Sequence, residues 1–129
     1  EVEMVTTTAD KSEGFTISVR VRYNEPVDVV TTGGTPTLAV TNGNEGTGTG
    51  RGPHTLSYAS GTGTNELIFS LAIAAANAAT NADDVLTVGA QNIALNSGTI
   101  KDASGTASDA AVAISSAQGT AAGSVTVTA

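Results

Sequence analysis

The alternation of apolar and polar residues is most regular in one stretch, residues 15–23. Every second position there is apolar, and the positions between them are polar or charged. Side chains of a β-strand point to opposite faces with a period of two, so this stretch predicts a strand with one buried and one solvated side. Proline lacks a backbone N–H and restricts the residue before it, so the strand is predicted to stop at residues 24–26. The predicted buried side carries Phe15, Ile17, Val19, Val21 and Tyr23.

Shorter stretches with the same alternation follow, separated by segments rich in Gly, Pro, Asn and Ser. No segment carries a sustained helical stripe, although the alanine-rich residues 74–82 allow one short helical turn. Residues 118–123 are predicted to form a loop. Short strands at spacings of about ten residues are typical of a β-sandwich, so we expect an all-β fold of about seven to nine antiparallel strands. The other predicted strands lie within residues 1–8, 27–30, 37–41, 54–58, 66–73, 83–88, 91–95, 98–102, 110–115 and 124–128.

The length of 129 residues suits one domain with a single buried core. Residues 1–129 are therefore predicted to form one β-sandwich, with its recognisable core at about 14–116 and an extended C-terminal strand or tail at 117–129. The chain begins at Glu1 without a methionine, so we expect a processed protein or part of a longer one.

The net charge of −7, with only five Lys and Arg residues, argues against binding to nucleic acid, because phosphate contacts need clustered cations. A negative surface favours solubility at high copy number on an assembly. There is no cysteine, which excludes disulfides, cysteine-ligated zinc and thiol catalysis. No apolar run reaches about 18 residues, so no membrane insertion is predicted.

The sequence offers no catalytic constellation, and we expect a protein that is not an enzyme. His54 is the only histidine, and the chain has no nucleophile elbow of the G-x-S-x-G type. Because His54 follows a proline at the start of a predicted strand, we interpret it as a surface or strand-end residue. One histidine without cysteines also argues against a zinc site.

Calcium is the only cofactor for which the sequence offers candidate ligands. Calcium takes six to eight oxygen ligands, usually from a dense motif such as D-x-D-x-D, and no such motif is present. Glu25 and Asp102 are the weak calcium candidates, because they would meet across one end of a sandwich. The alternative is that the carboxylates are solvated turn residues, so the sequence predicts no metal or other cofactor.

The glycine-rich residues 42–53 form the longest stretch without a strand pattern. They are either a surface loop between two strands or an arm that reaches a neighbouring subunit. In the second interpretation, Asn44, Glu45 and Arg51 would bind the partner, with Arg51 as the anchor. Arg20 and Arg22 form a positive pair on the polar side of the strand at 15–23, which is either a solvated face or a second contact for an acidic neighbour.

Three motifs resemble a bacterial immunoglobulin-like repeat of the adhesin type. Residues 23–27 and 34–38 are similar to its opening F-S-E-P-V and G-T-P-T-L and read YNEPV and GTPTL here. Residues 58–69, YASGTGTNELIF, look like its hairpin Y-x-S-G-x-G-T-x-x-L-x-F. Residues 95–103, LNSGTIKDA, look like its segment L-N-G-G-T-I-K-D-A, with Ser97 in place of a glycine.

The resemblance implies an immunoglobulin-like sandwich with a structural or adhesive role. Such repeats build large bacterial surface adhesins, and similar modules occur on the virions of tailed phages, including marine and cyanobacterial ones. The long 42–53 segment departs from the compact repeat, and the Asp-rich linkers that carry calcium between tandem repeats are missing. We therefore expect a head decoration or accessory protein on a virion surface that binds capsid subunits, aids adhesion and forms homo-oligomers. The alternative is a spacer repeat of an adhesin on the bacterial cell surface.

Overall fold

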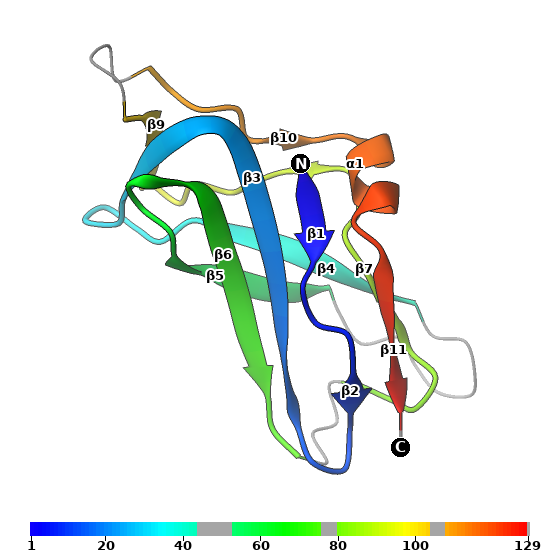
Figure 1. The fold of residues 1–129 in the computed structure, drawn as a ribbon. Coiled ribbons are helices and arrows are strands. Elements are labelled where there is room, and N and C mark those ends of the chain that lie inside the picture. Colours follow the sequence, from blue (N-terminus) through cyan, green and yellow to red (C-terminus); the bar gives the residue numbers. More distant parts are fainter. Residues whose placement is uncertain (44–52, 76–79, 104–107, 129) are drawn as a thin grey trace.

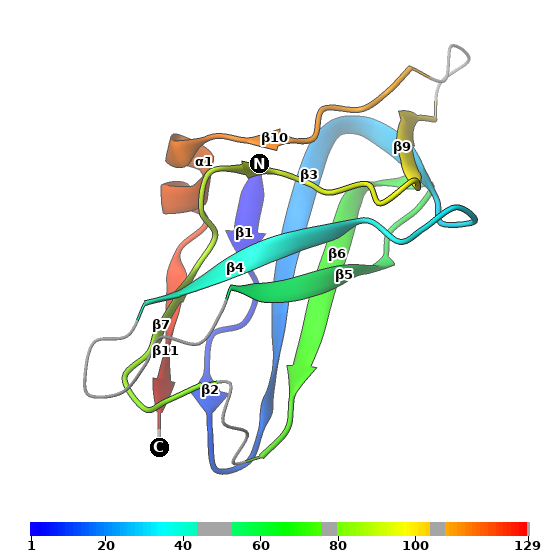
Figure 2. The ribbon, with the colours of Figure 1, turned by 180° about the vertical axis from the view of Figure 1, so that it is seen from behind.

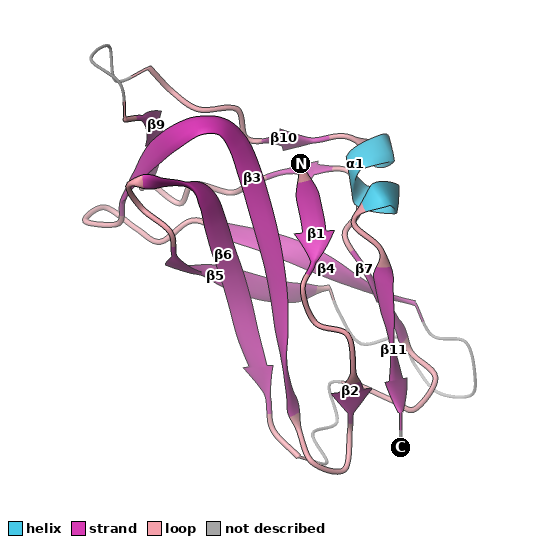
Figure 3. Ribbon diagram, viewed as in Figure 1, coloured by secondary structure: helices cyan, strands magenta, loops and turns pink. Residues whose placement is uncertain are grey.

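The computed structural model confirms an all-β fold made mostly of antiparallel strands (Figure 1). It describes residues 1–43, 53–75, 80–103 and 108–128. Within these ranges the only helix is α1, Ser116–Ala121, which stands out in the colouring by secondary structure (Figure 3).

The described residues form eleven strands, more than expected, because several of them are only two or three residues long. The strands are β1 Val2–Met4, β2 Ala9–Asp10, β3 Phe15–Val30, β4 Thr37–Gly43, β5 His54–Ser60, β6 Thr64–Ile73, β7 Val85–Thr87, β8 Gln91–Asn92, β9 Thr99–Asp102, β10 Ala113–Ile114 and β11 Ser124–Thr128.

The strands form two layers that share one curled sheet (Figure 2). One layer has the order β1-β3-β6-β5 and the other β4-β7-β11-β2, with β5 hydrogen-bonded to β4 where the sheet curls. Taken in chain order, this is the arrangement of an immunoglobulin-like sandwich, in which strands A, B, E and D face strands C, F and G. Strand β9 pairs with the far half of β3, and β8 and β10 form a separate two-stranded sheet.

The N-terminal segment lies at both edges of the curled sheet. Strand β1 pairs antiparallel with β3, and Val2 lies opposite Val21. After residues 5–8 the chain crosses to the other layer, where β2 pairs parallel with β11 and Ala9 lies opposite Val127. One short stretch of chain therefore supplies the edge strand of each layer.

Strand β3 confirms the predicted alternation and corrects the predicted end. Ile17, Val19 and Val21 are buried in the core, and Phe15 and Tyr23 pack against it. The strand does not stop at Pro26 but continues to Val30, because its register shifts between Arg22 and Val27. A bulge accommodates a proline without breaking a ladder hydrogen bond, and the Pro26 carbonyl accepts one from the Ala103 amide.

The core lies between the two layers and is made almost entirely of aliphatic side chains. Strands β3 and β6 form its centre, where Val19 lies opposite Phe69. The Phe69 ring meets Tyr58 edge to face, with the ring centres 6.1 Å apart. The predicted hairpin at residues 58–69 is present as β5 and β6, joined by a turn at residues 61–63.

The chain between β7 and β11 forms a long insertion that crosses one end of the sandwich and carries β8, β9, β10 and α1 (Figure 1). The helix corrects the loop prediction for residues 118–123. Ser115 caps its N-terminus, accepting a hydrogen bond from the Gln118 amide, while the Gln118 side chain accepts one from the Ser115 amide. The expected helical turn at 74–82 falls largely on residues 76–79, which lie outside the described residues.

Candidate functional site

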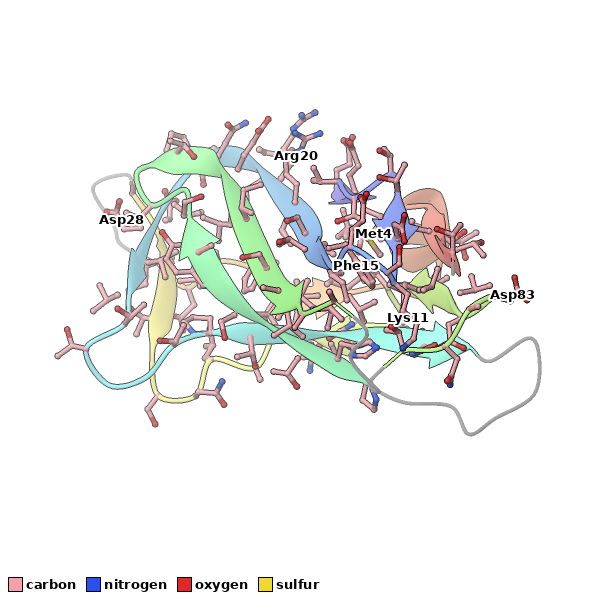
Figure 4. All side chains as sticks on the ribbon, turned by 90° about the horizontal axis from the view of Figure 1, so that it is seen from below. Met4, Lys11, Phe15, Arg20, Asp28 and Asp83 are labelled. Carbon is pink, nitrogen blue, oxygen red and sulfur yellow. The ribbon has the colours of Figure 1, made fainter. Side chains whose placement is uncertain are left out.

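The arginine pair on the outer face of β3 is engaged within the chain. The guanidinium of Arg20 lies 2.6 Å from the Glu3 carboxylate, and that of Arg22 lies 2.8 Å from the Glu66 carboxylate. Arg22 also approaches Glu1 at 3.4 Å. Hydrogen bonding and the charge of Glu3 raise the pKa of Arg20 above its ordinary value. Figure 4 shows Arg20 pointing away from the core.

This outer-face network explains why both arginines follow the strand alternation so regularly. Strands β1 and β6 flank β3 and place acidic side chains beside each cation. Three carboxylates for two guanidinium groups leave the face without an excess of positive charge. The geometry therefore fits a solvated, internally paired face better than an open cationic contact, although a contact for an acidic neighbour remains a prediction.

The two calcium candidates meet at one end of the sandwich, as expected; we call Glu25 and Asp102 the apical pair. Glu25 lies in the bend of β3 and Asp102 ends β9, which pairs with the same part of β3. A hydrogen bond to the Asp102 carboxyl, together with repulsion from its charge, raises the pKa of Glu25 above its ordinary value. A carboxyl pair of this kind shares a proton more readily than two separated acids.

The apical pair borders a shallow groove of about 310 Å³. Within the described part of the chain, no group of three or more His, Cys, Asp and Glu side chains is placed to hold a metal ion. Asp109, which also lines the groove, is engaged by Lys101 at 2.9 Å. Calcium binding by Glu25 and Asp102 thus stays a prediction, with two carboxylates in reach of each other.

The glycine-rich segment carries three of the partner-binding candidates. Asn44, Glu45 and Arg51 all lie in residues 44–52, outside the described residues. The segment follows Gly43 of β4, which pairs with Val85 of β7, and leads to β5, whose first residue His54 pairs with Val40 of β4. The role of this segment as an arm stays a prediction.

A second concentration of polar groups, which the sequence did not indicate, lies inside the sandwich. We call Asn42, His54, Thr80 and Asp84 the basal cluster. Three of these residues continue the inward-facing series of a strand, because each stands two positions from a fully buried aliphatic residue: Asn42 from Val40, His54 from Leu56 and Asp84 from Leu86. Among the described residues, the buried polar side chains are those of His54, Thr80 and Asp84, all at this end.

The basal cluster is held by a small set of hydrogen bonds. The Nδ2 atom of Asn42 lies 3.1 Å from Nε2 of His54. The Oδ2 atom of Asp84 accepts from the Asn81 amide at 2.7 Å, which closes the turn before β7. The carbonyl of Thr80 accepts from Nζ of Lys11 at the rim. Figure 4 places Lys11 and Asp83 on one side of the molecule and Asp28, next to the apical region, on the opposite side.

Three of the four residues of the basal cluster are buried, and Asn42 is half-buried. His54 is 6% exposed, and Thr80 and Asp84 are 0% exposed. In the described structure, Oγ1 of Thr80 and Oδ1 of Asp84 are buried without a hydrogen-bond partner. The interpretation of His54 as a surface residue is therefore wrong: it does begin a strand, but its side chain faces the core. The sequence did carry a signal for this: His54 is two positions from Leu56, so the two side chains point to the same face of the strand.

Two further grooves lie beside the insertion. One, of about 410 Å³, runs between the segment after β7 and helix α1, and its walls are small and hydroxyl-bearing residues. The other, of about 300 Å³, lies between β1 and β3 on one side and the segment around β10 on the other. Among the described residues no helix has the length and apolar character needed to cross a membrane.

No family model, curated protein or solved structure matches this chain.

Proposed function

We propose that this chain is a non-enzymatic structural module of a tailed-phage virion, which decorates the head by binding capsid subunits and aids adhesion. The observation that carries the proposal is the N-terminal segment, which pairs with β3 in one layer and with β11 in the other. Long exposed sheet edges pair with other chains, and edge strands as short as β1 and β2 limit such pairing, which suits a module displayed in many copies. The net charge of −7 also keeps such copies soluble.

The motifs that resemble the bacterial immunoglobulin-like repeat support the proposal by their places in the fold. Residues 58–69 build the β5–β6 hairpin, and residues 95–103 lead into β9 beside the bend of β3. The motifs thus form strands and turns of the sandwich. Their residues turn the chain or fill the core, as expected of a module whose role is to hold a shape.

The partner contact is proposed for the arm between β4 and β5. Arg20 and Arg22 already bind Glu side chains of the same chain, so a partner would have to displace those ion pairs. Asn44, Glu45 and Arg51 stand in the segment that joins the end of β4 to the start of β5. The capsid subunit, or a second copy in a homo-oligomer, would bind these residues.

The deciding experiment follows the native protein. An antiserum against the purified chain is applied to density-gradient fractions of a lysate from its natural source, separating virions, cell envelopes and soluble proteins. Detection in the virion band, with a mass near that of this chain, supports the proposal. Detection only among free soluble proteins would contradict any role in a surface assembly.

The alternative function, a spacer repeat of a large bacterial adhesin, is favoured by a different observation. The N- and C-terminal ends of the described chain lie at opposite ends of the sandwich (Figure 1). Copies joined end to end would therefore extend into a rod. In the gradient experiment, detection in the envelope fraction as part of a much longer chain supports this alternative and contradicts the virion proposal.

The arm is tested by substitution in the whole chain. Replacing Asn44, Glu45 and Arg51 by alanine should abolish co-sedimentation with purified particles and leave the melting temperature unchanged. A matched control replaces Thr47 and Thr49 of the same segment by alanine and should bind normally. If the triple variant binds as tightly as the control, the contact lies elsewhere.

A further inference from the structure

His54 is the only histidine of the chain, and its side chain is buried in the basal cluster. Its ordinary pKa of 6.5 lies in the range in which histidine serves as a pH-dependent group. It is also the first residue of β5 and lies opposite Val40 near the end of β4. Its state therefore bears directly on how the two strands are held at the open end of their pairing.

The contact between His54 and Asn42 requires a neutral imidazole. An amide nitrogen can only donate, so Nδ2 of Asn42 donates to Nε2 of His54, and the ring proton resides on Nδ1. Protonation at Nε2 would place one donor against another at 3.1 Å and bring a cation into a nearly closed site. Both effects oppose the closed arrangement.

We propose that His54 and Asn42 form an acid-sensitive latch that closes the open end of the β4–β5 pairing at neutral pH and releases it when His54 is protonated. The residues between the two strands, 44–52, carry the proposed partner-binding arm. Opening the latch would change how the base of that arm is held. The latch itself rests on the basal cluster and does not require the proposed virion function.

The pKa of His54 depends on its burial and on the charged groups near it. Burial, the dominant effect, lowers the pKa of His54 below its ordinary value, and the charge of Asp84 raises it in part. Lys11 is the positive group at the rim, where it binds the Thr80 carbonyl of the turn before β7. Among the described residues, Asp84 is the one charged side chain whose charge acts on the pKa of His54.

The sign of the effect follows from linkage. A histidine whose pKa is lower in the folded than in the unfolded protein favours folding when neutral. This contribution is fully present above the unfolded value, near 6.5, and is lost as the pH falls toward the folded value. Within that window the opening constant of the latch should rise by up to about tenfold for each pH unit.

The test is backbone hydrogen exchange of the whole chain at pH 7.5 and pH 5.0, corrected for the intrinsic effect of pH on exchange. Amides of β4 and β5 near Asn42 and His54 should open more readily at pH 5.0, while those at the centre of β3 and β6 stay protected. In His54→Gln the amide oxygen can still accept from Asn42, but nothing titrates, so the difference between the two pH values should vanish. An unchanged difference in this variant would overturn the proposal.

A second measurement keeps the proposal testable if His54→Gln folds poorly. The chain has one histidine, so its ring protons can be followed by NMR without ambiguity. The ring should titrate below pH 6.5 and in step with the opening of β4 and β5. Titration at or above pH 6.5, or opening that does not follow it, would overturn the latch.

Discussion

The two ends of the sandwich hold ionisable groups in opposite ways. At the apex, Glu25 is exposed and shares a hydrogen bond with the half-buried Asp102; this hydrogen bond, together with the repulsion between the two carboxylates, raises the pKa of Glu25. At the base, His54 is buried beside Asn42, and its pKa is lowered because burial disfavours the charged form. Protonation of Glu25 therefore stabilises the apex, whereas protonation of His54 destabilises the base.

The comparison teaches that solvent exposure decides how strongly a change of charge at each end alters the stability of the fold. The apical pair can move apart in water and let solvent screen the repulsion, so its cost is small. The basal groups cannot move apart without opening the sandwich, so each of their hydrogen bonds matters. Stability should therefore change more steeply where His54 titrates than where Glu25 titrates: it falls with falling pH in the first case and rises slightly in the second.

The largest expected effect comes from placing a charge in the aliphatic core between the two ends, where no polar group can bind it. Val19 is 0% exposed at the centre of β3, with no polar group opposite it. Val19→Asp would bury an unpaired carboxylate there and should cost more than about 4 kcal/mol, which unfolds a typical domain. Circular dichroism during urea denaturation measures it; an unchanged midpoint would contradict the burial of this face.

A smaller effect separates hydrogen bonding from charge within the base. Asp84→Ala removes the acceptor for the Asn81 amide and should cost about 1.5–3 kcal/mol. Asp84→Asn keeps an acceptor oxygen of the same shape and should cost clearly less. Urea denaturation at pH 7.5 compares the two; equal losses would mean that the charge of Asp84, and not its hydrogen bond, stabilises the turn.

The smallest effect lies at the apex and has the opposite dependence on pH. A carboxyl whose pKa is raised in the folded protein contributes stability that is lost as the pH rises through that value. Glu25→Gln keeps a donor for Asp102 and removes the repulsion, so it should raise the melting temperature slightly at pH 7 and have no effect at pH 3. Thermal melts at both pH values check this, and a drop at pH 7 would argue that Glu25 has a stabilising partner.

The frame of the sandwich was predictable because burial imposes a period of two on each strand. The alternation at residues 15–23 located the centre of the core, and the motif at residues 58–69 indicated a hairpin. Pro26 misled the prediction because a bulge removes the need for its missing N–H. The helix escaped notice although Ser115 and Gln118 have the spacing of a capping box, because it is only six residues long.

The basal cluster was harder to predict because it depends on contacts between distant residues. Asn42 and His54 are twelve positions apart, and Asp84 comes from another part of the chain. Each of them looked like an ordinary polar residue at a strand end. Asn42, His54 and Asp84 each stand two positions from a buried aliphatic residue, Val40, Leu56 or Leu86, so the alternation alone predicts that their side chains face inward. That the three side chains lie near one another follows only from the pairing of the strands.

The parallel pairing of β2 with β11 has a mechanical consequence. A force that draws residue 1 away from residue 128 acts on β2 at its N-terminal end and on β11 at its C-terminal end. Because the two neighbouring strands are parallel, the force pulls them in opposite directions along their length. The hydrogen bonds between them, such as that from the Lys11 amide to the Thr128 carbonyl at 2.8 Å, then bear the load together and do not break one after another. Stretched between its ends, the sandwich resists by shear.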